Sequence, residues 1–331
     1  MDTPASPDAL CDELRTAWHR YVDLLRPLRP ALHAYCLRLT GNLWDAEDLA
    51  QDTLLAAFGA LGQIHQPIAH PRAYLLRVAT NRWIDQVRRR AVEREVLGRA
   101  DGAAEPAPEP GALRDAAAAL MSRLSPQERA AFVLKESFDM ALEEIAFVLS
   151  TSVGAVKAAL HRGRARLHEP DAPARRPVPS AALVDRFVAL YHARDKDGLV
   201  ALMLDAGQVE NVGCGLEFGR ERFEGDTGWF HHFVHGHPEW PPAFQYESAR
   251  LARVDFEGEP VAIALVVRRG REALEQVLRL EERDGGIARI RDYAFCPETM
   301  REVGARLGLP VRTGLYRYPT PAPGQFYTSP A

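Results

Sequence analysis

A helix-turn-helix pattern between residues 142 and 167 constrains the fold of this chain more than any other feature. The segment reads LEEIAFVLSTSVGAVKAALHRGRARL, in which two short helical stretches flank a Ser/Thr-rich turn. In the second stretch, apolar and small residues recur at helical spacing and predict one buried face. This face comprises Val156, Ala159, Leu160, Gly163 and Leu167. The outward face carries the basic residues Lys157, His161, Arg162, Arg164 and Arg166, without an acidic residue between positions 157 and 168.

Two interpretations of this basic face follow. A basic helix after a short helix and a turn is typical of a recognition helix that enters the DNA major groove. The alternative is the solvated charged face of an ordinary helical bundle. The whole chain has 41 Lys+Arg against 45 Asp+Glu and a net charge of −4, so its overall charge does not indicate a nucleic-acid partner. The DNA interpretation therefore depends on the local clustering of basic residues.

The cysteine pattern and the hydropathy restrict the classes of protein to which this chain can belong. The four cysteines (Cys11, Cys36, Cys214 and Cys296) are far apart and form no CxxC pair, so neither a disulfide framework nor a zinc ribbon is expected. The N-terminal MDTPASPDAL is acidic and polar, unlike a signal peptide. The longest aliphatic run, Val261–Val267, is too short to cross a bilayer. We expect a reduced, cytoplasmic protein without a membrane segment, a metal or a cofactor.

Residues 10–97 are predicted to form an all-helical domain. The expected helices run from about Leu28 to Gly41, from Asn42–Asp45 to Leu61, and from about Arg72 to Leu97. The inward-facing residues of the second helix are predicted to be Leu49, Leu54, Leu55 and Phe58. Those of the third are predicted to be Leu76, Ala79, Trp83 and Val87. The first turns of the second helix are crowded by Asp45, Glu47, Asp48 and Asp52, more acids than the helix dipole needs.

Segments of biased composition and a helix-capping motif predict where the linkers lie and where a helix begins. Residues 98–117 are rich in Ala, Pro, Glu and Gly without an apolar period, which is typical of a linker. Ser125-Pro126-Gln127-Glu128 is a capping box with proline at the first helical position. The expected divisions are a helical domain at 10–97, a linker at 98–117, a helix-turn-helix domain at 118–168, a Pro-rich linker at 169–180, an α+β domain at 181–300 and an aromatic, Pro-rich tail at 301–331.

Three segments of the first half, taken in order, carry a resemblance to a known family. They are DAEDLAQDTLLAAF, AYLLRVATNRWIDQVRRR and the block from LSPQERAAFVL to the basic helix. Over roughly residues 20–168 the chain resembles the extracytoplasmic-function (ECF) sigma factors of the sigma-70 family. The resemblance implies a factor that binds core RNA polymerase, recognises the −35 and −10 elements of promoter DNA and initiates transcription.

The resemblance also implies roles for particular residues. Contact with the β′ clamp helices of polymerase would fall to Asp45, Glu47, Asp48, Gln51 and Asp52. Melting and recognition of the −10 element would fall to Arg77, Asn81, Arg82, Asp85, Arg88, Arg89 and Arg90. Recognition of the −35 element would fall to Lys157, Ala158, His161, Arg162, Arg164 and Arg166. The helix-turn-helix domain would also meet the β flap of polymerase. Two alanines, Ala158 and Ala159, replace longer polar residues of the family, which favours readout partly through DNA shape.

The second half of the chain has a different pattern, in which strand-like runs follow a helix. An amphipathic helix is expected at Leu183–Met203, followed by strands, and Asp284-Gly285-Gly286 is the strongest hairpin signal. The predicted order of helix and strands, together with the segment RIRDYAFCPETM, resembles that of the SnoaL-like branch of the NTF2-like fold. This fold is a cone of curved sheet around a pocket. The histidines of WFHHFVHGHPEW have metal-ligand spacing, but a polar loop or helix end is the favoured interpretation.

The predicted fold is therefore multidomain: a sigma region 2 helical bundle, a sigma region 4 helix-turn-helix, and an α+β NTF2-like cone. The predicted function is transcription initiation without catalysis, regulated by the C-terminal domain through a small-molecule ligand or an intramolecular contact. Two alternatives remain open. One is a ligand-sensing helix-turn-helix regulator that binds duplex DNA without polymerase. The other is a SnoaL-like isomerase or cyclase, which requires a buried acid or base with a shifted pKa that the sequence does not display.

Overall fold

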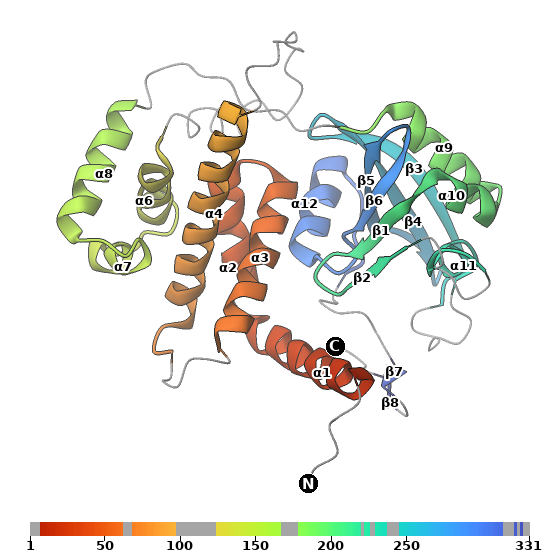
Figure 1. Cartoon of the computed structure of the whole chain (residues 1–331), viewed down its shortest axis with the longest axis horizontal. Coiled ribbons are helices and arrows are strands. Elements are labelled where there is room, and N and C mark those ends of the chain that lie inside the picture. The colour runs from red at the N-terminus through yellow and green to blue at the C-terminus, as the bar shows by residue number, and fades with distance from the viewer. Residues whose placement is uncertain are drawn as a thin grey trace. The chain divides into compact units, whose positions relative to one another are not determined.

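The chain divides into two compact units, unit 1 (Met1–Arg175) and unit 2 (Arg176–Ala331). Figure 1 shows unit 1 as a set of helices and unit 2 as a sheet with helices. The computed structural model describes residues 7–61, 68–96, 124–166, 178–219, 222–225, 229–236, 245–313, 321–322 and 325–326. The linker expected at 98–117 lies outside these residues, as does most of the linker expected at 169–180.

Unit 1 is helical throughout its described part, as the periodicity predicts. The helices of its first half are α1 (Pro7–Leu25), α2 (Arg29–Thr40), α3 (Leu43–Leu61) and α4 (Pro71–Val96). Those of its second half are α6 (Pro126–Glu136), α7 (Leu142–Val148) and α8 (Val153–Arg166).

The helix boundaries in the first half follow local sequence signals. Helix α2 ends at Gly41, whose φ of 75° is left-handed and whose N–H donates to the carbonyl oxygen of Leu37. Asn42 then starts α3, because its side-chain oxygen accepts from the backbone N–H of Asp45 at 3.0 Å. The predicted break between these two helices is therefore confirmed.

The core of the first half lies between α2, α3 and α4. Tyr35 of α2 is fully buried, and its hydroxyl is hydrogen-bonded to Thr80 Oγ1 of α4 at 2.8 Å. Trp83 is buried with the predicted stripe of α4, which confirms the core interpretation of this ring. The prediction for Leu55 is wrong, because its side chain is 56% exposed. It lies three residues beyond Asp52, on the outward face of α3.

The second half of unit 1 contains the predicted helix-turn-helix. Both halves of the capping box are present: Glu128 N–H donates to Ser125 Oγ, and Ser125 N–H donates to Glu128 Oε2 at 3.1 Å. Helix α8 begins after Ser152, whose hydroxyl accepts from the N–H of Ala155. Val156, Ala159 and Leu160 are buried against the neighbouring helices, as their spacing predicts.

Helix α6 packs against α2 and α4 through one buried arginine and one aromatic ring. The Arg129 guanidinium lies 5.7 Å from the centroid of the Trp83 ring and donates to the Arg38 carbonyl oxygen. Burial lowers the pKa of Arg129 to about 10. Beyond the end of α6, Phe138 meets Tyr35 edge-on at a centroid distance of 5.7 Å. These contacts join the two helical halves into one compact unit.

Unit 2 is built around a six-stranded mixed sheet. Its strands are β1 (Met203–Asn211), β2 (Gly215–Phe218), β3 (Ser248–Phe256), β4 (Glu259–Arg268), β5 (Arg271–Arg283) and β6 (Gly286–Asp292). They lie in the order β2-β1-β6-β5-β4-β3, and only β1 and β6 run parallel. The predicted hairpin joins β5 to β6, where Asp284 and Gly285 have left-handed φ values of 51° and 75°.

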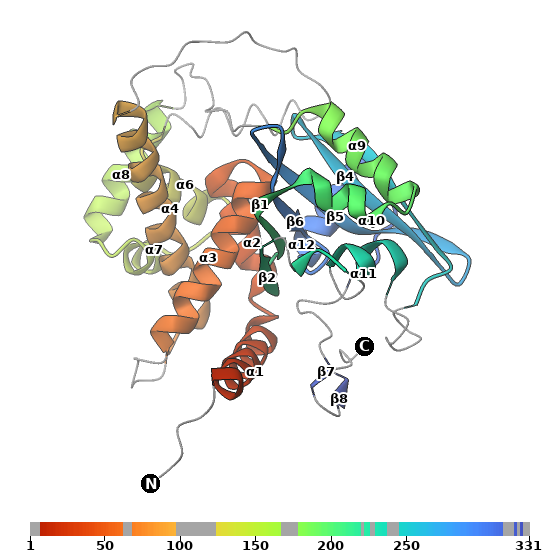
Figure 2. The same ribbon diagram turned by 45° about the vertical axis from the view of Figure 1, so that its right-hand side comes forward.

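Helices cover both faces of this sheet. One face carries α9 (Ala181–His192), α10 (Lys196–Leu202) and α11 (Trp229–His235), and the other carries α12 (Pro297–Leu307), as Figures 1 and 2 show. Apolar side chains of α9, α10 and α11 and of the strands form one continuous core, which we call the inner core. Further two-residue strands, β7 (Pro321–Ala322) and β8 (Gln325–Phe326), pair in the tail.

Two boundaries in unit 2 differ from the sequence-based expectation. The single helix expected at 183–203 is two helices, because Arg194 takes a left-handed φ of 55° and Asp195 caps a new helix at Gly198 N–H. The domain end expected at residue 300 falls inside α12. The chain beyond α12 also returns to the sheet, where Arg312 N–H donates to the Leu274 carbonyl oxygen. Among the described helices, none is long and apolar enough to cross a membrane.

Candidate polymerase and nucleic-acid interfaces

The acidic residues of α3 divide between two faces of the helix. Asp45, Asp48 and Asp52 lie three and four residues apart on the outward side, which Leu55 extends. Glu47 and Gln51 lie on the inward side and are 0% and 7% exposed. The expectation that these two contact polymerase does not fit their burial. Helical spacing already carries this signal, because Glu47 follows the buried Leu43 by four residues and precedes the buried Leu54 by seven.

The inward carboxylate of Glu47 is the centre of a buried polar cluster. Its Oε1 accepts from Arg29 Nη2 of α2 at 2.5 Å and from Gln51 Nε2 at 2.7 Å. Its Oε2 lies 3.5 Å from His33 Nε2. Arg29 and His33 are themselves almost fully buried. Burial and the Glu47 charge raise the pKa of the neighbouring Cys36 thiol well above its ordinary value. This cluster holds α2 to α3 and is structural.

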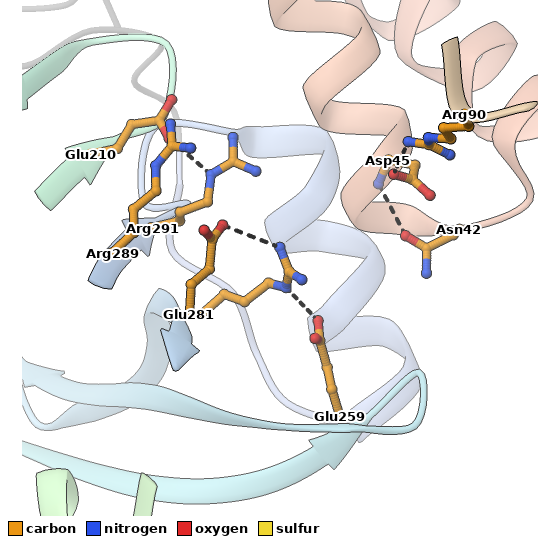
Figure 3. A network of polar contacts seen from close by, with 9 residues as sticks. Asn42, Asp45, Arg90, Glu210, Glu259, Glu281, Arg289 and Arg291 are labelled. Atoms are coloured by element: carbon orange, nitrogen blue, oxygen red, sulfur yellow. Dashed lines mark hydrogen bonds and ion pairs between the residues drawn. The ribbon is translucent and has the colours of Figure 1, made fainter. Parts of the chain in front are cut away.

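The outward acids of α3 contact the basic helix beside them. Asp45 Oδ1 lies 3.3 Å from Arg90 Nη2, and Asp52 Oδ2 accepts from Gln86 Nε2 at 3.2 Å. Figure 3 shows Asp45 between Asn42 and Arg90. Both Arg90 and Asp52 are exposed, so each contact contributes roughly 0–1 kcal/mol and is easily exchanged for a partner.

Helix α4 presents most of the predicted −10 residues to solvent. The exposed members are Asn81, Arg82, Asp85, Arg88, Arg89 and Arg90. Arg77 is half-buried instead, and its guanidinium lies 4.8 Å from the centroid of the Phe147 ring of α7. Arg88 lies 3.9 Å from Asp85 one turn away, and both side chains are exposed. Arg90 lies seven residues after the buried Trp83 and pairs with Asp45 of α3, whereas the other exposed members form an arginine-rich track along one side of α4.

Helix α8 presents Lys157, Ala158, His161, Arg162 and Arg164 to solvent. Two of its arginines are held by acids of α6. Arg162 Nε donates to Glu128 Oε1 at 2.9 Å, and Arg164 Nη2 donates to Glu136 Oε1 at 2.8 Å. The side chain of Arg166 and the whole of Leu167 lie outside the described residues. The sequence indicates only the capping role of Glu128. Its contact with Arg162 could not be predicted, because the two residues are 34 positions apart and lie on different helices.

Among the described residues of unit 2, Asp292 is a buried acid with a shifted pKa, a feature the sequence did not display. Asp292 lies on the inner-core face of β6, where Ala294 N–H donates to Oδ1 at 2.9 Å and Gln276 Nε2 donates to Oδ2 at 3.0 Å. Burial raises the pKa of Asp292 to about 7. Both carboxylate oxygens of Asp292 accept hydrogen bonds from within unit 2, and its neighbour on the strand, Ile290, belongs to the inner core. We therefore interpret Asp292 as a structural acid.

The histidines and cysteines of unit 2 form no metal centre in the described part of the chain. The rings of His231 and His235, one helical turn apart on α11, have centroids 4.9 Å apart. No group of three or more described His, Cys, Asp or Glu side chains is arranged to hold a metal ion. Cys214 and Cys296 are thiols, and the buried Cys296 donates its S–H to the Val212 carbonyl oxygen at 3.6 Å.

The sheet face opposite the inner core carries two groups of ion pairs, shown in Figure 3. Glu210 Oε2 lies 2.6 Å from Arg289 Nη2 and 2.8 Å from Arg291 Nε. Arg279 Nε lies 2.6 Å from Glu259 Oε1. Because carboxylates match these arginines, this network is not a basic track of the kind that DNA binding needs.

Comparison with known proteins identifies the same two regions of unit 1. Residues 24–92 match the family model described as Sigma-70 region 2, and residues 114–167 match Sigma-70, region 4. The ECF RNA polymerase sigma factor SigG of Mycobacterium tuberculosis is 32% identical over 285 residues, which cover 74% of this chain and 72% of that protein. SigJ of the same organism is 33% identical over 191 residues, 53% of this chain and 60% of that protein.

A crystal structure of the M. tuberculosis factor SigJ covers 82% of this chain and 95% of its own, at 23% identity. The TM-score of the two structures is 0.32. The relationship to SigG, in contrast, extends over almost three quarters of both chains and beyond the two helical regions. On that similarity, the chain belongs to the ECF family of RNA polymerase sigma factors.

Proposed function

We propose that three exposed helix faces of unit 1 carry the work of this sigma factor. Sigma-70 regions 2 and 4 imply core RNA polymerase and promoter DNA as partners. The observation that carries the assignment of faces is the separation of charge on neighbouring helices. The outward side of α3 carries acids, of which Asp52 is exposed and Asp45 and Asp48 are partly exposed, whereas arginines project from α4 and a lysine, a histidine and arginines from α8. In this proposal, polymerase carries out the chemistry and the chain supplies binding and placement.

The polymerase-facing surface would be the outward stripe of Asp45, Asp48, Asp52 and Leu55 on α3. Opposite charge on the β′ clamp helices would speed encounter and fix the register of binding. The exposed leucine adds an apolar contact beside the acids. Glu47 and Gln51 are left out of this surface because their side chains lie inside the bundle.

The DNA-facing surfaces would be the exposed track of α4 for the −10 element and α8 for the −35 element. On α4 the arginines would follow the strand backbone, while the amide of Asn81 would contact an extruded base. On α8, Lys157, His161 and Arg162 would reach base edges or nearby phosphates, with Ala158 at the DNA surface. Arg164 and Arg166 would contact the backbone. The helix-turn-helix domain would in addition meet the β flap.

Unit 2 would regulate this activity rather than catalyse a reaction. Its inner core is filled by apolar side chains, and Asp292 is engaged by internal donors. Regulation would act through an intramolecular contact or a small ligand, with the NTF2-like arrangement of sheet and helices as the framework. A chain that ends before residue 176 should then give a different transcript yield from the whole chain, and an equal yield would contradict this role.

Run-off transcription tests the proposal as a whole. Purified core polymerase is mixed with the chain on a DNA fragment that carries its own upstream promoter. We expect a specific transcript that appears only when both proteins are present. A variant in which Asp45 and Asp52 are both replaced by Lys should lose core binding. Tight duplex binding without polymerase, and no transcript with it, would instead identify the ligand-sensing regulator.

A further inference from the structure

A single carboxylate in α6 joins the helix start to the proposed DNA surface. Glu128 Oε2 accepts from the backbone N–H of Ser125, which caps α6, at 3.1 Å. Its other oxygen, Oε1, accepts from Arg162 Nε on α8 at 2.9 Å. The Glu128 side chain is 3% exposed, whereas that of Arg162 is 56% exposed. The acid is thus fixed from within, while the arginine it holds reaches the surface.

The way the pair is made leaves the guanidinium usable. The contact uses Nε, the nitrogen nearest the backbone, so the pair does not require the two terminal NH2 groups. A guanidinium restrained in this way loses less rotamer freedom when its terminal nitrogens bind phosphate or guanine. Helix α8 also lies close to α6 here, since a Cβ added at Gly163 would stand 3.8 Å from Glu128 Cβ.

A second pair on the same surface provides a comparison. Arg164 Nη2 lies 2.8 Å from Glu136 Oε1, but both side chains are exposed, at 61% and 42%. A solvated carboxylate at the end of α6 is mobile and is screened by salt, so it orders its arginine weakly. The buried Glu128 is the acid in the described part of α6 that can hold an arginine of α8 in one orientation.

We propose that Glu128 is a positioning residue for promoter recognition, which orients Arg162 toward the −35 element. The inference rests on the proposed role of α8 and deepens it. In this inference Glu128 contributes to −35 recognition without touching DNA, because it acts through the side chain of Arg162. Loss of the Glu128 charge would free the Arg162 guanidinium to sample several rotamers, and the −35 contact would weaken while the helix-turn-helix stays folded.

A double-mutant cycle on two templates tests this inference. The proteins are the wild type, E128Q, R162A and E128Q/R162A, each bound to core polymerase. Glutamine is chosen because it still completes a capping box. One template carries a promoter whose start site has been mapped with this holoenzyme, and the other has its −35 segment replaced. Transcript yield is measured at low polymerase concentration, and thermal unfolding of each protein is recorded.

On the intact template we expect R162A to lower the yield about tenfold, the usual effect of losing one specific arginine contact. E128Q should lower it about threefold, because part of the contact survives without orientation. The double variant should match R162A, since Glu128 acts only through Arg162. On the replaced template all four proteins should agree within about twofold. The matched control E136Q should behave as the wild type on both.

Several results would overturn the inference. If E128Q lowered the transcript yield a further threefold in the R162A background, Glu128 would act independently of Arg162. An equal loss on both templates would make its effect purely structural. Should E128Q unfold at the assay temperature, R162Q replaces it, because glutamine has no guanidinium to pair with Glu128; a yield equal to the wild type would then refute the pair's role. A wild type that does not distinguish the templates would refute the proposed role of α8 itself.

Discussion

Replacement of Glu47 by alanine should destabilise unit 1 strongly, because Glu47 lies on the inward side of α3, whereas the other acids of this helix lie on its outward side. The carboxylate is 0% exposed and is engaged by Arg29, Gln51 and His33. Its removal leaves the Arg29 charge buried without its carboxylate. Breaking one side of a buried ion pair costs about 3–5 kcal/mol. With about 2–4 °C lost per kcal/mol for a domain of this size, the melting temperature of unit 1 should fall by roughly 10 °C.

The assay is differential scanning calorimetry of the whole chain, in which the two units can unfold in separate transitions. D52A is the matched control, because Asp52 is an exposed acid of the same helix and should change stability by no more than about 0.5 kcal/mol. The double variant R29M/E47L removes both charges at similar volume and should recover most of the loss. Equal melting temperatures for E47A and D52A would refute the reasoning. So would an E47Q variant that melts normally but fails to bind core polymerase.

The remaining predictions concern unit 2 and the glycines. The raised pKa of Asp292 means that the folded state keeps a proton that the unfolded chain releases, so stability present below pH 3.8 is lost as the pH rises to about 7. D292N should abolish this loss, which is on the order of 4 kcal/mol, and its gain over the wild type should grow with pH in urea denaturation; a constant difference would contradict it. G304A should destabilise unit 2 by about 1–3 kcal/mol, because the added methyl would overlap Val311 Cγ2 in the segment after α12. G154A, on an open face of α8, should instead stabilise that helix by up to about 1 kcal/mol in thermal unfolding. A gain for G304A or a loss for G154A in the same measurements would contradict the respective prediction.

Local signals in the sequence determined most elements of unit 1. The break between α2 and α3 needs only Gly41 and Asn42, and the start of α6 needs only the Ser125 capping box. The hairpin between β5 and β6 likewise follows from its Asp-Gly turn. These signals act between residues a few positions apart, so the amino-acid sequence is sufficient to predict them. The same holds for the basic face of α8.

Side-chain partners were decided by the tertiary structure. Periodicity alone separates Glu47 from the outward acids of α3, yet its partner Arg29 comes from another helix. The pairing of Glu128 with Arg162 spans 34 residues, and the raised pKa of Asp292 requires strands from three parts of unit 2 to enclose it. Burial and Coulomb interactions depend on which surfaces the folded chain brings together, and residue spacing within one helix or strand does not contain that information. The sequence by itself therefore determined the helices, their caps and the family, whereas only the packed structure decided which charges stay inside and which face a partner.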